Sequence, residues 1–234
     1  MAKIAESFKE FRFNSPFAVV FNTEGLYWLL YDSSFRGAVT NSDLIYVDGI
    51  GLWILLRICG FSDCKRLHGP DLFHQLLHDT SGQRKLIIGG TDVAHIKLFR
   101  KYPQLRKSKL HYFDAGKFSE NDISPVDSLI ERFNPDEIYV CLGIRKQEKL
   151  GLKIREAYPD TAVVGVGASI DFESGNVLRS PLWAQKLGIE WLPRMLKEWR
   201  LFPRFYRSLK GLLIFSYFRI FNKRKISEYL GFLS

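Results

Sequence analysis

The sequence predicts an α/β protein with a doubly wound, largely parallel sheet and helices on both faces, in a Rossmann-like arrangement. Six short runs rich in Val, Ile, Leu and Tyr recur along the chain, and the first five are each followed by a segment with helical periodicity. Strands that alternate with helices of about 10–15 residues are typical of this class. The 234 residues, of which 46% are hydrophobic, are enough to bury the core of one domain with a modest appendage.

The elements follow in order along the first half of the chain. FAVVFN at 17–22 predicts a strand, and a helix is expected near residues 24–33. LIYV at 44–47 predicts the next strand, before the helical segment DGIGLWILLRICG. KLIIGG at 85–90 predicts a third strand, before the helical segment TDVAHIKLFRKY.

The second half repeats the pattern. KLHYFD at 109–114 is followed by a helix around residues 122–133, and EIYVCLG at 137–143 by a helix near residues 145–157. TAVVGVG at 161–167 ends the series. Ligands of such sheets bind at the carboxyl ends of the strands. This rule selects the loops at Asn22, Asp48, Gly89-Gly90, Gly143 with Gln147, and Gly165 to Asp171.

The glycine-rich loops do not complete a known phosphate-binding motif. Gly165-Val166-Gly167 follows a strand, but position 170 is Ile170, so the dinucleotide pattern G-x-G-x-x-G fails. The sequence also lacks the P-loop motif and the G-x-S-x-G motif of α/β-hydrolases. No cofactor is therefore expected. Gly89-Gly90-Thr91-Asp92 has two open interpretations, a phosphate site at a helix end or a tight turn with an N-cap.

Asp48 is the most suggestive single acid. It follows the strand LIYV and precedes Gly49 and Gly51, so its carboxylate is expected at the ligand-facing edge of the sheet. A carboxylate there can accept a proton from a substrate hydroxyl. From residue type alone, an N-cap for the helix that starts at Gly49 is the favoured alternative.

Neither a metal site nor a disulfide framework is expected. The odd number of cysteines (Cys59, Cys64 and Cys141) favours a reducing compartment, and their spacing does not suit zinc. The chain has no Asp-x-Asp pair to hold a divalent ion, and Asp171-Phe172-Glu173 is the most similar segment. A bound diphosphate would then need arginines and backbone amides. No export signal or membrane-spanning run is evident, so the expected location is the cytoplasm.

The positive charge is concentrated in the tail. Residues 191–234 hold ten Lys or Arg against two acids, which accounts for +8 of the formal net charge of +9. We therefore divide the chain into a core at 1–190 and a basic, amphipathic helical appendage at 191–234. Basic residues at intervals of three or four would share one side of a helix that Pro203 breaks or kinks; they are Arg194, Lys197, Arg200, Arg204, Arg207 and Lys210. The many apolar positions beside them favour an anionic membrane surface over nucleic acid.

Four segments together resemble the WecG/TagA/CpsF family of bacterial glycosyltransferases, glycosyltransferase family 26. They are DGIG at 48–51, RLHGPDL at 66–72, LGIRKQE at 142–148 and the stretch from GVGASIDFESGNVLRSPLW onward, and the likeness covers roughly residues 17–207. The resemblance implies an inverting, metal-independent transfer of N-acetylmannosamine, glucose or a related hexose from a UDP-sugar to a sugar on undecaprenyl diphosphate.

The resemblance also implies roles for single residues. Asp48 matches the family's proposed general base, which reverses the preference for a helix cap, and Asn22, Arg66 and Gln147 match its binding pocket. The glycine-rich strand end forms a wall of the nucleotide-sugar pocket, and we add the strand-end glycines and several arginines as substrate-binding candidates; they are Gly89, Gly143, Gly165, Gly167, Arg179, Arg194, Arg200, Arg204 and Arg207.

The sequence departs from the family pattern at positions that bear on the sugar. Val20 stands where the family has Thr, Arg145 replaces the usual Pro of P-K-Q-E, and Leu150 replaces a Trp. In the tail, Trp199 follows Glu198 where the family has Pro. These changes leave the expected reaction type in place and leave the identity of the transferred sugar open.

Two other functions stay open at this point. One is a non-catalytic protein that binds a glycolipid or an anionic membrane through its tail, and the other is an RNA-binding protein that uses the basic end. The preferred expectation is a cytoplasmic enzyme, peripheral on the inner face of the plasma membrane, with no nucleic-acid partner. A homo-oligomer is neither required nor excluded.

Overall fold

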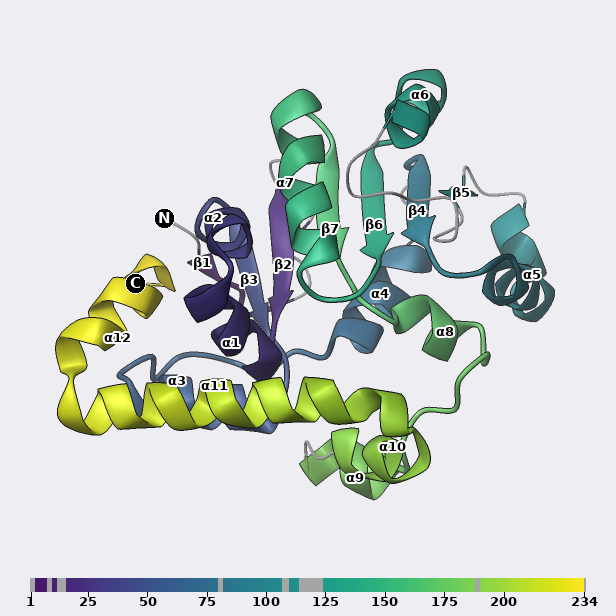
Figure 1. Ribbon diagram of the computed structural model, residues 1–234. Coiled ribbons are helices and arrows are strands. Elements are labelled where there is room, and N and C mark those ends of the chain that lie inside the picture. The colour runs from purple at the N-terminus through teal and green to yellow at the C-terminus, as the bar shows by residue number, and fades with distance from the viewer. Residues whose placement is uncertain are drawn as a thin grey trace. The chain divides into compact units, whose positions relative to one another are not determined.

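The computed structural model describes residues 3–7, 10–11, 16–79, 82–106, 110–113, 124–187 and 190–233 (Figure 1). The chain forms two compact units. The first comprises Met1–Ser7, Phe21–His68 and Arg179–Ser234, and the second comprises Phe8–Val20 and Gly69–Leu178. Every described strand pair is parallel, and helices flank the strands, so the predicted α/β class is confirmed.

The sheet of the second unit has the order β2-β7-β6-β4-β5. Its strands are β2 (Phe17–Phe21, whose last residue belongs to the first unit), β4 (Lys85–Gly89), β5 (Leu110–Phe113), β6 (Glu137–Cys141) and β7 (Ala162–Gly165). Every residue of β4, β6 and β7 is buried. Parallel strands covered on both faces read as continuous apolar runs, which is why the sequence located them.

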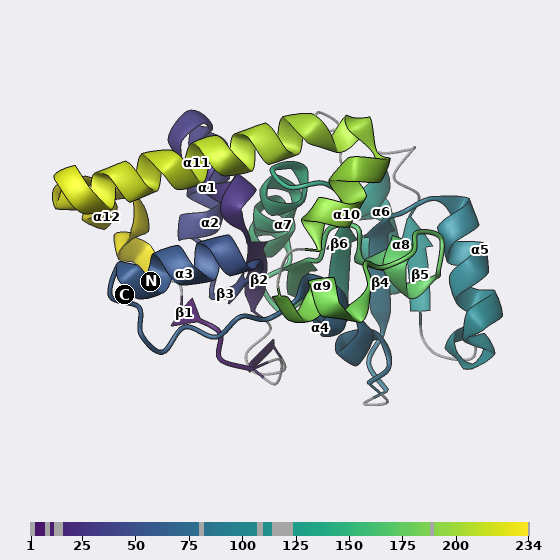
Figure 2. The ribbon, with the colours of Figure 1, turned by 90° about the horizontal axis from the view of Figure 1, so that it is seen from below.

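Helices cover both faces of this sheet. They are α4 (Gly69–Leu77), α5 (Asp92–Lys101), α6 (Ser124–Phe133), α7 (Lys146–Ala157) and α8 (Ser169–Glu173), with a 3₁₀ turn η2 (Pro103–Arg106). Figures 1 and 2 show α6 and α7 on one face and α4 on the other. A Cβ at Gly151 of α7 would lie 2.5 Å from the Phe17 ring, so this glycine permits close packing on β2.

Two of these helices were not predicted from the sequence. α4 begins at Gly69, inside the segment RLHGPDL, and Pro70 occupies its first turn, where a missing N–H costs nothing. α8 has only five residues, so it is too short to show a helical period. The predicted helix around residues 122–133 is α6, although its first two positions lie outside the described residues.

The first unit pairs β1 (Lys3–Ile4) with β3 (Leu44–Val47) in parallel. Asp48, just after β3, donates its backbone N–H to the carbonyl of Phe21, at the end of β2, over 2.8 Å. The first helices of the unit are α1 (Thr23–Tyr31), α2 (Ser33–Thr40) and α3 (Ile50–Ile58). β1 and α2 are additions to the prediction.

The tail belongs to the first unit, and its described residues are mostly helical. After α9 (Leu182–Leu187), which precedes it, its elements are α10 (Trp191–Lys197), η4 (Trp199–Leu201), α11 (Phe202–Phe221), α12 (Lys223–Leu230) and η5 (Gly231–Leu233). The break expected at Pro203 is present, because α10 ends at Lys197 and α11 begins at Phe202. The basic residues expected on one side of a helix are therefore divided among α10, η4 and α11. Pro203 lies in the first turn of α11, where its fixed φ is favourable.

α11 packs along α1 (Figures 1 and 2). A Cβ at Gly211 would lie 2.7 Å from the backbone N of Tyr27, so glycine lets the two helices approach closely. Phe215 is fully buried, and its ring meets that of Tyr229 from α12 edge to face at 6.0 Å. The guanidinium of Arg36 in α2 lies 5.0 Å from the same Tyr229 ring. The functional boundary at residue 190 stays a prediction.

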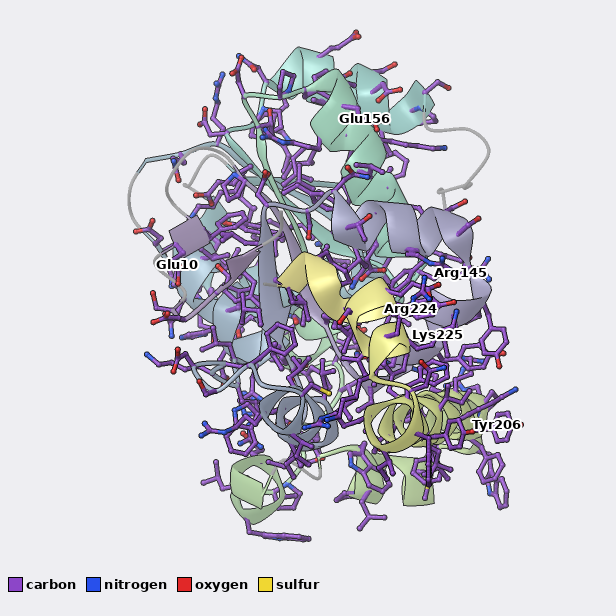
Figure 3. All side chains as sticks on the ribbon, turned by 90° about the vertical axis from the view of Figure 1, so that its left-hand side faces the viewer. Glu10, Arg145, Glu156, Tyr206, Arg224 and Lys225 are labelled. Atoms are coloured by element: carbon purple, nitrogen blue, oxygen red, sulfur yellow. The ribbon has the colours of Figure 1, made fainter. Side chains whose placement is uncertain are left out.

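The opposite side of α11 exposes an apolar stripe. Figure 3 shows Tyr206 pointing away from the ribbon of this helix. The stripe residues follow one another at helical intervals and are each at least 44% exposed; they are Phe202, Tyr206, Leu209, Leu213, Tyr217 and Ile220. Among the described helices, none has both the length and the hydropathy required to cross a membrane.

Candidate active site

Asp48 does not cap the helix that follows it. The N-cap of α3 is Gly49, with φ 88°, and no side chain hydrogen-bonds the free amides there. The positive φ at Gly49 turns the chain before the helix begins, which favours glycine. The Asp48 carboxylate, 29% exposed, lies with its Oδ1 3.5 Å from Nδ1 of His68. The N-cap alternative is therefore wrong, and a catalytic role for Asp48 stays a prediction.

His68 lies between two carboxylates. Its Nδ1 is 3.5 Å from Asp48 Oδ1 and 3.6 Å from Glu190 Oε1. Arg179 in turn places its Nε 3.3 Å from Glu190 Oε2. In the order Asp48, His68, Glu190 and Arg179, the side chains alternate between negative and positive charge when His68 is protonated. Each is at most 29% exposed. Arg179, a predicted substrate-binding residue, thus has a carboxylate partner within the protein.

The environment favours the protonated form of His68. Its hydrogen bond to Asp48 is the largest cause and raises the pKa of the imidazole above 6.5; burial opposes this, and the charges of Asp48 and Glu190 reinforce it. Sequence reasoning missed both His68 and Glu190. His68 lies inside the segment RLHGPDL, but only its contact with Asp48 distinguishes it from any other loop histidine.

Asn22 and Arg66 lie beside the same strand ends. Asn22 follows β2, and its Oδ1 caps α1 by accepting the N–H groups of Glu24 at 3.0 Å and Gly25 at 3.2 Å. Its Nδ2 is thus the amide atom that can face a ligand. Arg66 forms a parallel bridge with Val47 at the end of β3, and its Nη2 lies 3.5 Å from the carbonyl of Gln185. The first unit therefore brings Asn22, Asp48, Arg66 and His68 together.

In the second unit, Gln147 supports the glycine-rich strand end. Its Oε1 accepts the N–H of Gly167 at 2.8 Å, and its Nε2 donates to Glu148 at 2.7 Å. A Cβ at Gly165 would lie 3.1 Å from the Gln147 side chain, so glycine makes room for it. Gln147 is only 4% exposed. Its amide therefore orients the Gly165–Gly167 turn, while at Gly143 a Cβ would meet no atom within 4 Å.

The Gly89-Gly90 turn has the hydrogen bonds of a capped helix start. Thr91 accepts the N–H of Ala94 at 3.2 Å as the N-cap of α5. Nε2 of His95 lies 2.8 Å from the Gly89 carbonyl. Gly89 has φ 108°, and a Cβ there would lie 2.5 Å from the carbonyl oxygen of Cys141. The turn-and-cap interpretation thus accounts for this segment, and a phosphate contact at Gly89 stays a prediction.

Two of the tail arginines bind a buried acid. The Nε atoms of Arg204 and Arg207 donate to the two carboxylate oxygens of Glu24 at 2.9 and 2.8 Å. The Glu24 side chain is 2% exposed, so the two guanidinium groups supply the charge that compensates it. Arg200 in η4 is exposed, whereas the side chain of Arg194 lies outside the described residues.

Glu173 of the segment Asp171-Phe172-Glu173 contacts two histidines. His74 Nδ1 and His78 Nε2 lie 3.0 and 3.2 Å from its Oε1. Burial alone would raise the pKa of Glu173, but hydrogen bonds from Tyr102, His74 and His78 outweigh burial and lower it. Asp171 instead accepts the side-chain amide of Asn176 at 3.1 Å. From the sequence no histidine was expected at a metal-ligand spacing, but His74 and His78 are four residues apart and both contact Glu173.

The three cysteines are unsuited to nucleophilic chemistry. All are free thiols. Burial raises the pKa of Cys64 to about 11, against a smaller opposite effect of Arg57, and burial also raises the pKa values of Cys59 and Cys141. Thiols with raised pKa values stay protonated at neutral pH. The cysteines are therefore poor candidates for a nucleophile.

Comparisons with known proteins agree with these observations. The model of the Glycosyl transferase WecG/TagA/CpsF family matches residues 1–227. An N-acetylglucosaminyldiphosphoundecaprenol N-acetyl-beta-D-mannosaminyltransferase of Bacillus subtilis is 31% identical over 76% of this chain and 71% of its own. A protein of the same name from Staphylococcus aureus is 27% identical over 97% of this chain and 90% of its own. The chain therefore belongs to the WecG/TagA/CpsF family of glycosyltransferases.

Proposed function

We propose that this chain is an inverting glycosyltransferase that moves a sugar from a UDP-sugar to a sugar carried on undecaprenyl diphosphate, during the synthesis of a cell-surface polysaccharide. The observation that carries the proposal is Asp48, a partly exposed carboxylate at the end of a parallel strand that does not cap its helix. The relatives' names make N-acetylmannosamine the first donor to test, with glucose and related hexoses next.

The reaction is a single displacement. Asp48 removes the proton from the acceptor hydroxyl, and that oxygen forms a bond to the anomeric carbon from the side opposite UDP. The bond between the anomeric carbon and the UDP oxygen breaks, UDP leaves with the bonding electrons, and the configuration inverts. His68 positions the Asp48 carboxylate through their contact at 3.5 Å.

Arginines neutralise the diphosphate charge in this proposal. Arg66, Arg179 and Arg200 are the first-unit candidates with described side chains, and Arg194, six residues before Arg200, is a further candidate from the sequence. Arg204 and Arg207 primarily hold α11 on α1, because Glu24 already binds both. The transfer step uses no metal ion, so adding Mg²⁺ or Mn²⁺ to EDTA-treated enzyme should leave the initial rate unchanged.

Replacement of Asp48 by Asn tests the assignment. D48N should lower kcat by about 10²–10⁴-fold, since an amide cannot accept the proton, while donor binding measured by calorimetry stays nearly unchanged. The matched control is D63N, because Asp63 is an exposed acid of the same unit whose Oδ1 accepts the hydroxyl of its neighbour Ser62 at 3.3 Å. Near-normal turnover by D48N would refute the base assignment, and a product that keeps the donor's anomeric configuration would refute inversion.

We further propose that the exposed stripe of α11 lies on an anionic membrane surface, where the lipid-linked acceptor is found. Apolar side chains at helical spacing beside Arg200, Lys223 and Arg224 suit an interfacial helix. L213D should weaken co-sedimentation with phosphatidylglycerol vesicles, since Leu213 is 60% exposed in the middle of the stripe. V93D is the control, because Val93 is 55% exposed in α5.

The vesicle experiment also separates the alternative function. If the wild-type chain binds vesicles but transfers no sugar from any UDP-sugar to a short-chain lipid diphosphate acceptor, the chain is a non-catalytic glycolipid-binding or membrane-binding protein. If L213D and V93D sediment equally well, α11 is not the binding surface.

A further inference from the structure

Three side chains of the second unit converge beside α4 and α8. His74 lies on α4, His78 lies in the turn directly after it, and Glu173 is the last residue of α8. His74 and His78 are four residues apart, which places both rings on the same side of the chain, with centroids 4.6 Å from each other. The potential ligand atoms of the three residues all lie within 4.8 Å of one another.

The separations suit a tetrahedral metal ion. Zinc binds imidazole nitrogen and carboxylate oxygen at about 2.0–2.2 Å, which sets neighbouring ligand atoms of a tetrahedron about 3.3–3.5 Å apart. Here the Glu173 oxygen lies 3.0 Å from the His74 nitrogen and 3.2 Å from the His78 nitrogen. An ion would need only a small lengthening of these two Glu173 separations, and the two histidine nitrogens lie within 4.8 Å of each other. Two imidazoles and one carboxylate form a recurrent zinc ligand set that leaves one position for water.

The residues around the three candidate ligands leave a path for an ion and hold the ligands in place. The Glu173 side chain is 9% exposed, whereas His74 is 53% and His78 22% exposed, so an ion can enter from the histidine side. Tyr102 packs edge to face on the His78 ring at 4.4 Å, which restrains the orientation of that ring. Lys101 donates to the main-chain carbonyl of Glu173 at 2.7 Å, which holds the end of α8.

We propose that His74, His78 and Glu173 bind one divalent transition-metal ion, with zinc the best match, and that this ion ties α8 to α4. Imidazole ligands disfavour Mg²⁺ and Ca²⁺, which take oxygen ligands. α8 begins at Ser169, just after the Gly167 turn that Gln147 orients, so the ion stabilises the segment that follows the strand end. The site is structural and takes no part in the proposed transfer step.

Metal binding and stability test the proposal without reference to sugar transfer. The full chain, freed of any histidine tag and treated with EDTA, is titrated with Zn²⁺ by calorimetry and with Co²⁺ by visible absorption. We expect one ion per chain, the visible bands of tetrahedral cobalt, and a melting temperature that rises with zinc concentration. Absence of saturable binding would overturn the proposal.

Substitutions locate the ion. H74A should weaken zinc binding at least tenfold and leave the melting temperature of the metal-free protein nearly unchanged, because His74 is half exposed. E173Q also removes a ligand, but Glu173 is buried and its replacement can destabilise the fold. H74A is therefore the deciding variant. H111A is the matched control, since His111 is an exposed histidine of β5 in the same unit. Equal zinc affinity in H74A, H111A and the wild type would place the ion elsewhere and refute the site.

Discussion

The two units hold their candidate site residues in different ways. In the first unit the candidates are charged side chains with charged neighbours, such as Asp48 against His68 and Arg179 against Glu190. In the second unit they are glycines and one buried amide, Gln147. Its side chain accepts the N–H of Gly167 and donates to Glu148. The first unit therefore depends on charge and pH, whereas the second depends on backbone conformation. Substitutions that change only charge or only volume can test this difference.

The largest expected effect is in the second unit. G89A should lower the free energy of unfolding by roughly 2–4 kcal/mol, because a Cβ would lie 2.5 Å from the Cys141 carbonyl oxygen and the residue would hold φ 108°. G82A is the control, since Gly82 has φ 78° but no atom within 4 Å of a Cβ, so only about 1–2 kcal/mol of backbone strain applies. Urea unfolding measures both, and equal losses would show that the close approach at Gly89 is unimportant.

The next effect is in the first unit and concerns charge alone. E24Q should destabilise the protein by about 1–3 kcal/mol, because Glu24 is 2% exposed and accepts charged hydrogen bonds from Arg204 and Arg207. E228Q removes an equal charge from the exposed pair with Lys225, where the loss should stay below about 0.5 kcal/mol. If both variants unfold at the same urea concentration, the α1–α11 contact does not depend on this charge cluster.

The smallest effect concerns pH. His68 has a raised pKa in the folded protein, so its pairing with Asp48 adds stability that is fully present below about pH 6.5 and is lost as the pH rises through the folded value. The contribution should be about 0.5–1 kcal/mol, as for partly exposed pairs.

NMR titration of the His68 ring should give a pKa above 6.5 in the wild type and a lower value in D48N. An unchanged pKa in D48N would mean that Glu190, 3.6 Å from the same nitrogen, controls the histidine instead.

Sequence reasoning succeeded where the signal is local. The buried strands LIYV and EIYVC are continuous apolar runs because helices cover them, and the helical tail breaks just before Pro203, where the proline was expected to interrupt it. It missed β1, which has two residues, and α8, which has five, because neither is long enough to show a period.

The candidate site was only partly predictable, because some of its contacts join residues far apart in the sequence. Asn22, Asp48 and Arg66 follow from strand ends and from the family resemblance, and the structure brings them together in the first unit. Whether Asp48 caps a helix or faces a partner depends on the backbone at Gly49 and on His68, twenty positions further along the chain. Residue type alone favoured the wrong alternative, because a cap preference averages over many tertiary environments.

By itself, the sequence determined the α/β class, the positions of the main strands along the chain and the family. Only the tertiary structure decided which charges meet: Glu24 with arginines 180 and 183 residues away, and Glu173 with histidines 99 and 95 residues away. The physical reason is range. Strand and helix patterns arise from burial and hydrogen bonding within a few residues, whereas an ion pair or a metal site needs side chains that only the packing of distant segments brings within about 4 Å.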